Sequence, residues 1–420
     1  MITKRILNNA KLFPNKDAVV FNGTTVSYGD LAKSIHGKVL NGNDSSGIGF
    51  VFNTNPVETL CSVLASNLLK RPVLVVPEDF PKRNLDKHTE TGIPSDAFIG
   101  ILTSGSSGKP KTVWKSNDNW ELAFKHQSEV FSVGKEDKVF VLDALSYSAN
   151  LNAALHILWE GGTLVLGQLK KANKWQQMLE EREVTSCFLV PSHCQLLLQD
   201  GFVNENIKSL VTAGEKLPAK MAKELLEHFP KTILTEYYGA AELGHITYHQ
   251  NADIYNFPHS VGKPFPQVRV EVKDDKVTVS SPFVSSEYKE NGTVDDLGYF
   301  DKGDRLILKG RSGRMFNRRA LNIYAQEIEN IALEFDSVEK AVLVESEINQ
   351  RLSLYFTTNS KALGNDEEEL AAFLRECLPS SKMPSFVKEL KEIPHSNAGK
   401  VDFRALSKMS GEDKIMNIAS

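Results

Sequence analysis

The stretch that decides the fold of this chain reads Leu102-Thr103-Ser104-Gly105-Ser106-Ser107-Gly108-Lys109-Pro110-Lys111-Thr112-Val113. An apolar run at residues 97–102 leads directly into it and predicts a short buried strand. Small residues let the backbone turn tightly and approach a ligand, so that N–H and hydroxyl groups can point at one anion. The two lysines add positive charge that a polyphosphate would neutralise. The stretch therefore predicts a phosphate-binding loop at the end of a strand.

Two other interpretations of this stretch compete with the first. A Walker A loop needs Gly-x-x-x-x-Gly-Lys-Ser/Thr at the start of a helix. Here Gly105 and Gly108 are too close together, and Pro110 stands where the magnesium-binding hydroxyl should be. A surface hairpin would suit a Gly/Ser run taken alone equally well. The strand upstream and the two lysines favour the phosphate loop.

The composition is that of an ordinary globular protein. The chain has 420 residues, of which 41% are apolar and 24% charged, and this length allows more than one domain. A net charge of -4 gives no broad basic field, so we expect no nucleic-acid partner. No apolar run approaches the length of a membrane span, and the first residues lack the apolar core of a signal peptide. The four cysteines are isolated and lack metal-ligand spacing, which favours a cytoplasmic location.

Hydrophobic periodicity predicts a layered α/β architecture for the first part of the chain. Asn22-Gly23 between two short apolar runs is a strong hairpin signal. Helical patterns, such as those at 56–69 and 219–228, then alternate with strand patterns, such as those at 72–76 and 233–235. Such alternation is typical of a doubly wound parallel sheet, whose ligands bind at the carboxyl ends of the strands.

The pattern changes after about residue 260. Period-two strands there predict a small antiparallel β subdomain, and a separate module with both strand and helix patterns follows it. Gly313 is a candidate hinge between the two parts, since glycine absorbs large changes in φ and ψ. We therefore expect an α/β protein with a large N-terminal domain at 1–311, built from doubly wound α/β subdomains and the antiparallel subdomain. A small mobile α+β C-terminal domain would span 312–420.

The phosphate-loop stretch and three later segments together resemble one known family. The order Thr-Ser-Gly-Ser-Ser-Gly-Lys-Pro-Lys is similar to the phosphate-loop signature of the adenylate-forming superfamily, which contains acyl-CoA synthetases, peptide-synthetase adenylation domains and luciferases. Residues 237–242, 294–299 and 399–402 resemble further signatures of this superfamily and follow in the same order. The resemblance runs from about residue 18 to residue 406. It implies an enzyme that converts ATP and a carboxylic acid into an acyl-adenylate and pyrophosphate, and then transfers the acyl group to a thiol.

This resemblance assigns the residues that would bind ATP and Mg²⁺. Tyr237-Tyr238-Gly239-Ala240-Ala241-Glu242 resembles the family's Tyr-Gly-x-Thr-Glu, in which the tyrosine stacks on adenine and the glutamate binds the magnesium that bridges the phosphates. Ala241 stands where the family usually has threonine, so one phosphate-binding hydroxyl is missing. We expect the segment to follow a strand, and a carboxylate at a helix N-terminus is the alternative for Glu242. The expected nucleotide-binding residues are Thr103, Ser104, Gly105, Ser106, Ser107, Gly108, Lys109, Lys111, Gly214, Glu215, Tyr237, Tyr238, Gly239, Ala240, Ala241, Asp296 and Arg311.

Some of these assignments rest on shorter matches. Ala213-Gly214-Glu215-Lys216 resembles the family's adenine-contacting turn, although a plain strand-to-helix loop would also explain it. Asp296 takes the place of the aspartate that holds both ribose hydroxyls. Val294 and Asp295 depart from the usual Thr-Gly before it, so an exposed turn acid remains the alternative. Arg311 matches the arginine that contacts the ribose just before the hinge.

Lys400 is the expected catalytic lysine, together with Glu242. It lies in Gly399-Lys400-Val401-Asp402, which closely resembles the family's last catalytic signature. Adenylation brings a carboxylate against an α-phosphate, and a lysine that bridges the two anions offsets their repulsion. At about 4 Å and an effective dielectric constant near 20, one such contact is worth about 4 kcal/mol. This corresponds to roughly a thousandfold in rate.

The acid substrate is predicted from one position. Amino-acid-activating relatives place an aspartate after the strand that ends at Leu142, and it pairs with the α-ammonium group. Aligned from Gly161, this chain has Ser148 there, which favours a fatty or aryl acid. A small gap in the alignment would instead bring Asp143 into register. The expected pocket residues are Tyr147, Ser148, Ala149, Leu151 and Ala213, with Gly239 beside them.

The thiol acceptor is the least determined part. Coenzyme A is the first expectation, and the basic residues Lys309, Arg314, Arg318 and Arg319 would either bind its 3′-phosphate or form a solvated face. Relatives that make thioesters usually carry Lys-x-x-Gly where this chain has Asn317-Arg318-Arg319-Ala320. Two alternatives therefore remain. One is an adenylating enzyme that loads the pantetheine arm of a carrier protein, and the other is a catalytically weak paralogue that binds nucleotide or acyl ligand.

Overall fold

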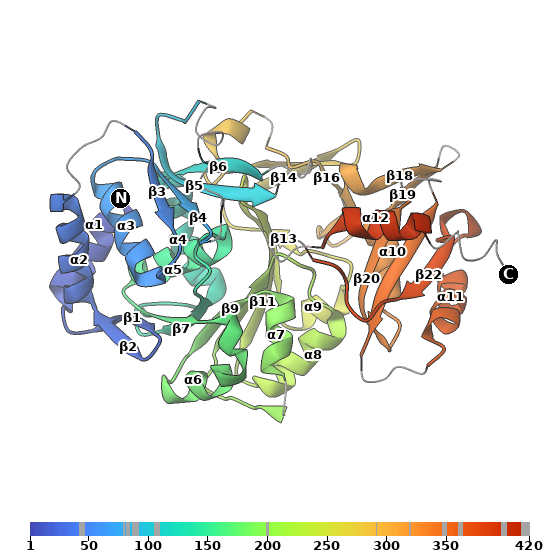
Figure 1. Ribbon diagram of the computed structural model, residues 1–420, viewed down its shortest axis with the longest axis horizontal. Coiled ribbons are helices and arrows are strands. Elements are labelled where there is room, and N and C mark those ends of the chain that lie inside the picture. The colour runs from blue at the N-terminus through green and yellow to red at the C-terminus, as the bar shows by residue number, and fades with distance from the viewer. Residues whose placement is uncertain are drawn as a thin grey trace. The chain divides into compact units, whose positions relative to one another are not determined.

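The chain forms two compact units. The first comprises Met1–Lys273, Thr278–Val294 and Phe300–Leu306, and the second comprises Asp274–Val277, Asp295–Tyr299 and Ile307–Ser420. Figure 1 shows the whole chain, a computed structural model. The structure describes residues 1–41, 47–78, 80, 85, 92–104, 110–198, 201–290, 292–318, 321–346, 351–359, 364–395 and 401–412. The expected domain boundary after residue 311 stays a prediction.

The first unit is organised by a nine-stranded sheet in the order β13-β12-β11-β10-β9-β7-β8-β1-β2. All neighbours from β11 through β10, β9, β7 and β8 to β1 pair in parallel. The strands are β1 (Asp17–Phe21), β2 (Thr24–Ser27), β7 (Lys138–Leu142), β8 (Thr163–Gly167), β9 (Ser186–Leu189), β10 (Ser209–Ala213), β11 (Ile233–Ala240), β12 (Gly244–Gln250) and β13 (Lys263–Pro264). The predicted hairpin is confirmed, since Asn22 and Gly23 join β1 to β2 with φ of 50° and 81°.

Helices cover both faces of this sheet, so its strands are buried on both sides. Val139 and Val141 of β7 point into one core and Phe140 between them points into the other. Figure 1 shows α6, α7 and α8 gathered beside the sheet, and their apolar side chains share the core with Phe140. The helices of the first unit are α1 (Ile2–Leu12), α2 (Tyr28–Asn41), α3 (Pro56–Leu68), α4 (Asn117–Phe131), α5 (Ser148–Glu160), α6 (Trp175–Glu181), α7 (Pro191–Leu197), α8 (Ala219–His228) and α9 (Ala252–Asn256). The predicted doubly wound core is confirmed.

A second, four-stranded sheet carries the phosphate-loop stretch. Its order is β3-β4-β5-β6, from β3 (Gly49–Phe52), β4 (Val73–Val76), β5 (Ala97–Ser104) and β6 (Pro110–Ser116). β5 and β6 are antiparallel, so the Gly/Ser run joins two paired strands. The strand β6 is not predicted in the sequence analysis above. The strands on either side of the run are thus paired as the hairpin interpretation expects, and the phosphate-loop interpretation stays a prediction.

The segment expected to follow a strand is itself the end of one. β11 continues through Ala240 and returns as the antiparallel strand β12. Glu242 therefore lies in the turn of a β-hairpin, and the alternative of a carboxylate at a helix N-terminus is wrong. The reason is pairing: residues 239 and 240 have low strand propensity, but they pair with β12 residues 244 and 245.

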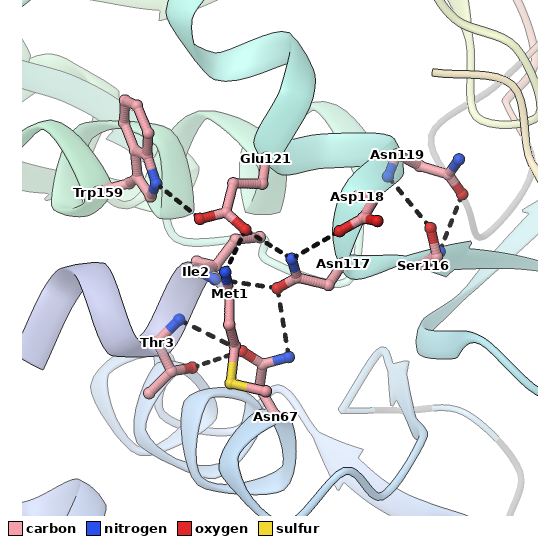
Figure 2. Close-up of polar contacts among 10 residues, drawn as sticks. All are labelled: Met1, Ile2, Thr3, Asn67, Ser116, Asn117, Asp118, Asn119, Glu121 and Trp159. Atoms are coloured by element: carbon pink, nitrogen blue, oxygen red, sulfur yellow. Dashed lines mark hydrogen bonds and ion pairs between the residues drawn. The ribbon is translucent and has the colours of Figure 1, made fainter. Parts of the chain in front are cut away.

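A polar network fastens the N-terminal helix to its neighbours (Figure 2). The amine of Met1 pairs with the carboxylate of Glu121 at 2.5 Å, and the Asn117 amide donates to the same carboxylate at 2.6 Å. Burial would raise the pKa of Glu121, but these two partners hold it below its usual value. The Thr3 hydroxyl donates to Asn67 Oδ1 at 2.9 Å. The network thus joins α1 to α3 and α4.

The remaining strands form smaller sheets. One has the order β14-β15-β16-β17, from β14 (Arg269–Lys273), β15 (Lys276–Ser280), β16 (Asp296–Phe300) and β17 (Leu306–Arg311). In the second unit, β18 (Met315–Arg318) pairs with β19 (Leu321–Tyr324), and β21 (Leu352–Thr358) lies between β20 (Val338–Glu345) and β22 (Phe386–Glu389). Helices α10 (Ala325–Ala332), α11 (Asp366–Cys377) and α12 (Phe403–Glu412) complete it. Within the described part of the chain, no helix has the length and apolar character needed to cross a membrane.

The loop before β13 requires glycine at residue 262. Gly262 has φ of +90°, and a Cβ there would lie 2.0 Å from the carbonyl oxygen of Tyr248. Because neither the backbone nor that carbonyl can yield cheaply, Gly262→Ala should lower the free energy of unfolding by about 3 kcal/mol. Gly37→Ala is the control: it meets no atom within 4 Å in helix α2 and should raise stability by about 0.5–1 kcal/mol. Urea unfolding measures both, and an unchanged midpoint for Gly262→Ala would contradict this loop conformation.

Candidate active site

The ends of the phosphate-loop stretch are held together by the β5–β6 pairing. Thr103 pairs with Lys111 and Ser104 with Pro110, and the Thr103 hydroxyl donates to the Lys111 carbonyl at 3.4 Å. The Lys111 side chain is exposed at this end of the hairpin. Gly105, Ser106, Ser107, Gly108 and Lys109 lie outside the described residues. The strands thus bring both ends of the predicted loop, with one of its two lysines, to one place.

The Tyr-Gly-x-x-Glu segment forms the β11–β12 hairpin. Gly239 pairs with His245, and a Cβ at 239 would lie 2.6 Å from the carbonyl oxygen of Gly244, so glycine is required. The ring of Tyr237 packs on His245 with centroids 4.6 Å apart and contributes to the core. Tyr238, the next residue of the strand, points to the opposite face of the sheet. Tyr238, Ala240, Ala241 and Glu242 are all half-buried.

Lys115 holds the turn of this hairpin, and sequence reasoning missed it. Its Nζ donates to the carbonyl of Glu242 at 3.1 Å and to the carbonyl of Phe283 at 3.0 Å. The lysine is 1% exposed, at the end of β6 that leads into α4. Burial lowers the pKa of its ammonium group to about 7, and the nearby Glu242 carboxylate opposes this shift. A buried amino group is therefore built into the fold beside the predicted magnesium ligand and binds the main chain of its turn.

Two buried histidines, His245 of the hairpin and His156 of α5, are neutral near pH 7. Burial, together with the charge of Lys115, lowers the pKa of His245 to about 3. Burial and the proximity of His245 lower the pKa of His156 to about 3. The His245 ring stacks on Phe265 with centroids 5.0 Å apart, an environment that suits a neutral ring.

A buried ionic network fixes the turn predicted to contact adenine. Ala213, the last residue of β10, pairs with Tyr237, so the turn begins beside the β11–β12 hairpin. Glu236, 3% exposed, accepts from the Leu217 N–H at 2.7 Å and pairs with Lys216 and His249 at 2.5 Å each. Burial would raise the pKa of Glu236, but Lys216 and His249 outweigh it and lower the pKa below its usual value.

The geometry of that turn also requires its glycine. Gly214 has φ of +89°, a backbone conformation that L side chains rarely adopt. Glu215 follows it and is exposed. Sequence reasoning found Gly214 and Glu215 but missed the clamp on the neighbouring residues 216 and 217, because nothing in the sequence shows that Glu236 points toward them.

Four of the five expected acid-pocket residues lie at the start of α5, and the fifth, Ala213, ends β10. Tyr147 is 44% exposed, Ala149 is exposed and Ser148 is half-buried. Leu151 has no exposed surface and packs in the main core, because helix α5 turns it inward. It is therefore not on a solvent-open wall, and we remove it from the pocket. Asp143 directly follows β7, and burial raises the pKa of its carboxyl group.

The second unit carries the predicted ribose ligands. Asp296 opens β16 and is 5% exposed, so the alternative of an exposed turn acid is wrong for it. The exposed turn acid is its neighbour Asp295, which pairs with Lys276 at 3.0 Å. Arg311 ends β17, and its side chain lies outside the described atoms.

Two of the four basic residues considered for a coenzyme A phosphate already have partners. Lys309 pairs with Asp275 at 2.8 Å. Arg314 forms two hydrogen bonds to Glu329, at 2.5 and 3.2 Å, and covers the ring of Phe403. The positions that would decide the remaining basic face and the thiol tunnel, Arg319 and Ala320, lie outside the described residues.

The expected catalytic Lys400 also lies outside the described residues, but both ends of its loop are anchored. His395 pairs with Val401 in an antiparallel bridge, and the Asp402 N–H donates to the Pro394 carbonyl at 2.8 Å. The Asp402 carboxylate then accepts from two N–H groups in the first turn of α12 at 3.1 Å each. The residues that flank 396–400 are thus fixed to one another within the second unit.

Magnesium would be held here by few protein ligands. Across the described ranges, no three His, Cys, Asp or Glu side chains gather as a metal-ligand set. A single carboxylate such as Glu242, completed by phosphate oxygens and water, is the kind of site in which Mg²⁺ binds with nucleotides. The half-buried hairpin turn of Glu242 fits that requirement.

Comparison with known proteins identifies the family. The profile described as "AMP-binding enzyme" matches residues 46–284, more than half of the chain. The chain belongs to this family. It is 30% identical over 329 residues to an uncharacterized acyl–CoA ligase, YhfT, of Bacillus subtilis, covering 73% of this chain and 67% of that protein. A putative long chain fatty acid–CoA ligase, VraA, of Staphylococcus epidermidis is 23% identical over 93% of this chain and 94% of its own length. The predicted membership of the adenylate-forming superfamily is confirmed.

Solved structures of adenylating enzymes share this AMP-binding fold. The O-succinylbenzoate coenzyme A synthetase MenE of Bacillus subtilis, in complex with ATP and magnesium ion, matches with a TM-score of 0.82. The match has 19% sequence identity and covers 96% of this chain and 99% of that one. At this identity the likeness shows the fold, and the predicted fold class is confirmed.

The buried histidines predict an acid-sensitive fold. Both have a pKa near 3 in the native state and near 6.5 when unfolded, so unfolding takes up protons below pH 6.5. Stability is therefore fully present above pH 6.5 and is lost as the pH falls, by about 2 kcal/mol per histidine at pH 5. His245→Phe keeps an aromatic ring in an aromatic cluster and should lose about 2 kcal/mol less than the wild type between pH 7 and 5. Equal losses in urea titrations at the two pH values would contradict a neutral His245.

Proposed function

We propose that this AMP-binding enzyme activates a fatty or aryl carboxylic acid with ATP and transfers the acyl group to coenzyme A. A carboxylate oxygen attacks the α-phosphorus, an O–P bond forms, and pyrophosphate leaves with the electrons of the broken P–O bond. In the second step a thiolate sulfur attacks the acyl carbonyl and AMP leaves. The observation that carries the proposal is the Tyr238–Glu242 hairpin, which lies beside the Gly214 turn at the carboxyl end of β10.

Different residues of the first unit would bind different parts of ATP. The phosphate loop with Lys111 would hold the phosphates, Tyr238 would stack on adenine, and Gly214-Glu215 would border the base. We assign the stacking role to Tyr238 rather than Tyr237, because the Tyr237 ring is occupied by His245. Glu242 would hold Mg²⁺, which neutralises phosphate charge during the displacement.

The remaining proposed ligands belong to the second unit. Asp296 and Arg311 would hold the ribose, and Lys400 would bridge the acid carboxylate and the α-phosphate. The burial of Asp296 supports a binding role over a solvated one. Rotation of this unit about Gly313 between the two half-reactions is part of the proposal.

The substrate class follows from the start of α5. Ser148 offers a hydroxyl but no charge for an α-ammonium group, and Tyr147 and Ala149 expose apolar surface beside it. The putative long chain fatty acid–CoA ligase VraA among the relatives supports an acid of this kind. Asp143 is the residue that would reverse this assignment, so amino acids belong in any substrate test.

Coenzyme A is the proposed acceptor, and the acyl-CoA ligase relative YhfT supports it. The pantetheine arm of a carrier protein is the second candidate, favoured by Ala320 where thioester-forming relatives usually have glycine. A cytoplasmic location is proposed with this function, because ATP and coenzyme A are its substrates and all four cysteines are unpaired.

A carboxylate panel in ATP–pyrophosphate exchange should identify the acid. We expect exchange with medium- or long-chain fatty acids or with aryl acids, and none with amino acids, because Ser148 stands where amino-acid-activating relatives have an aspartate. Addition of coenzyme A should then yield a thioester. Exchange with amino acids would contradict the substrate class. ATP binding without exchange for any acid would favour the ligand-binding paralogue, and exchange without a CoA thioester would favour a carrier protein.

The loss of Lys400 should abolish adenylation without abolishing nucleotide binding. Lys400→Ala should reduce pyrophosphate exchange about a thousandfold, because one bridging charge is removed from the transition state. Its affinity for ATP, measured by calorimetry, should change little. Lys391→Ala, which removes an exposed lysine of the same unit, is the control and should exchange normally. Near-normal exchange in Lys400→Ala would refute the assigned role.

A further inference from the structure

Lys115 is a fully buried lysine whose only described partners are main-chain carbonyls. Its ammonium group donates to the carbonyls of Glu242 and Phe283, which come from two segments far from it in sequence. A buried lysine is costly unless its charge is hydrogen-bonded, and here two neutral acceptors take the place of a carboxylate partner. The amino group of Lys115 therefore holds the Glu242 turn and the Phe283 segment against β6.

The segment around Phe283 is packed against the hairpin from several sides. The Ser285 N–H donates to the Glu242 carbonyl at 2.9 Å, so that oxygen accepts two hydrogen bonds. A Cβ added to Gly244 would lie 2.9 Å from the Cβ of Phe283, so hairpin and segment are in close contact. The position of Glu242 thus depends on residues 283–285, and both depend on Lys115.

Asn119 in the first turn of α4 holds the same segment but not the hairpin. Its amide donates to the carbonyls of Pro282 at 3.1 Å and Val284 at 2.9 Å. It also completes the capping box with Ser116. Asn119 and Lys115 therefore both bind main-chain carbonyls of residues 282–284. Of these two side chains, Lys115 alone also binds the Glu242 carbonyl.

Strand β6 connects the two parts of the predicted nucleotide site. Lys111 lies at the phosphate-loop end of β6, and Lys115 lies four residues further along. At a rise of about 3.3 Å per residue, the two lysines are separated by roughly 13 Å of extended strand. One rigid strand therefore connects the base of the phosphate loop to the turn that carries Glu242.

We propose that Lys115 is a positioning residue for the magnesium–nucleotide site, fixing the Glu242 turn relative to the phosphate loop through the Glu242 main-chain carbonyl. This inference rests on the proposed function, in which Glu242 binds magnesium. Lys115 itself touches neither substrate nor metal. Its removal should loosen the turn, so that Glu242 meets the metal in fewer conformations and Mg²⁺–ATP binds less tightly.

The test compares Lys115→Met, Asn119→Ala, Glu242→Gln and the wild type. Calorimetric titration with ATP, in the presence of Mg²⁺ and again with EDTA, reads the metal-dependent part of binding without requiring turnover. Lys115→Met should weaken Mg²⁺–ATP binding about tenfold, or about 1.4 kcal/mol, and leave metal-free ATP binding unchanged. Asn119→Ala should lower the unfolding midpoint but keep the wild-type response to Mg²⁺.

In pyrophosphate exchange, Lys115→Met should raise the KM for Mg²⁺–ATP about tenfold and change kcat by less than about threefold. Normal Mg²⁺ dependence in Lys115→Met would overturn the inference, and so would an equal shift in Asn119→Ala, since that would indicate only a loosened fold. An unchanged Mg²⁺ response in Glu242→Gln would overturn it together with the magnesium role of Glu242. Wild-type protein that binds Mg²⁺–ATP but exchanges no pyrophosphate would contradict the proposed function alone.

Discussion

One constraint positions the site: parallel strands that are buried on both faces end at a common edge of the sheet. The register of β10 and β11 places Ala213 beside Tyr237, so the Gly214 turn leaves the sheet where the hairpin continues beyond it. The register is fixed by the two cores, because Leu210 and Val211 of β10 point to opposite sides. A slip of one residue would exchange them and move every site residue to the wrong face.

Buried charged side chains fix the two turns that extend beyond the edge of the sheet. Glu236 holds the turn after β10 through Lys216 and the Leu217 N–H, and Lys115 holds the β11–β12 turn through the Glu242 carbonyl. In each case a turn that moved away would leave a buried charge or polar group without its partner, which costs several kcal/mol. Because an unpaired buried charge or polar group costs this much free energy, the two turns are held rigidly in place.

Sequence reasoning found what depends on local pattern and missed what depends on tertiary contact. The Asn22-Gly23 hairpin and helix α8 follow from turn chemistry and periodicity, and both form as expected. The end of β11 was missed because residues 239 and 240 have a loop-like sequence and become strand only by pairing with β12. The sequence does not single out Lys115, since the carbonyls that it binds lie 127 and 168 residues away. Leu151 was expected in a pocket because it is apolar and close to Ser148, and the local sequence does not show that α5 turns it into the core.

The two loops expected to carry the chemistry share one design, although they belong to different units. Residues 105–109 are closed by the Ser104–Pro110 pair, and residues 396–400 by the His395–Val401 bridge. Each closed stretch is five residues long, so the entropy lost in bringing its ends together is small and is already compensated by backbone pairing. In the proposed function each of these stretches contributes a lysine to the phosphates, and backbone pairing fixes the residues that flank it on both sides.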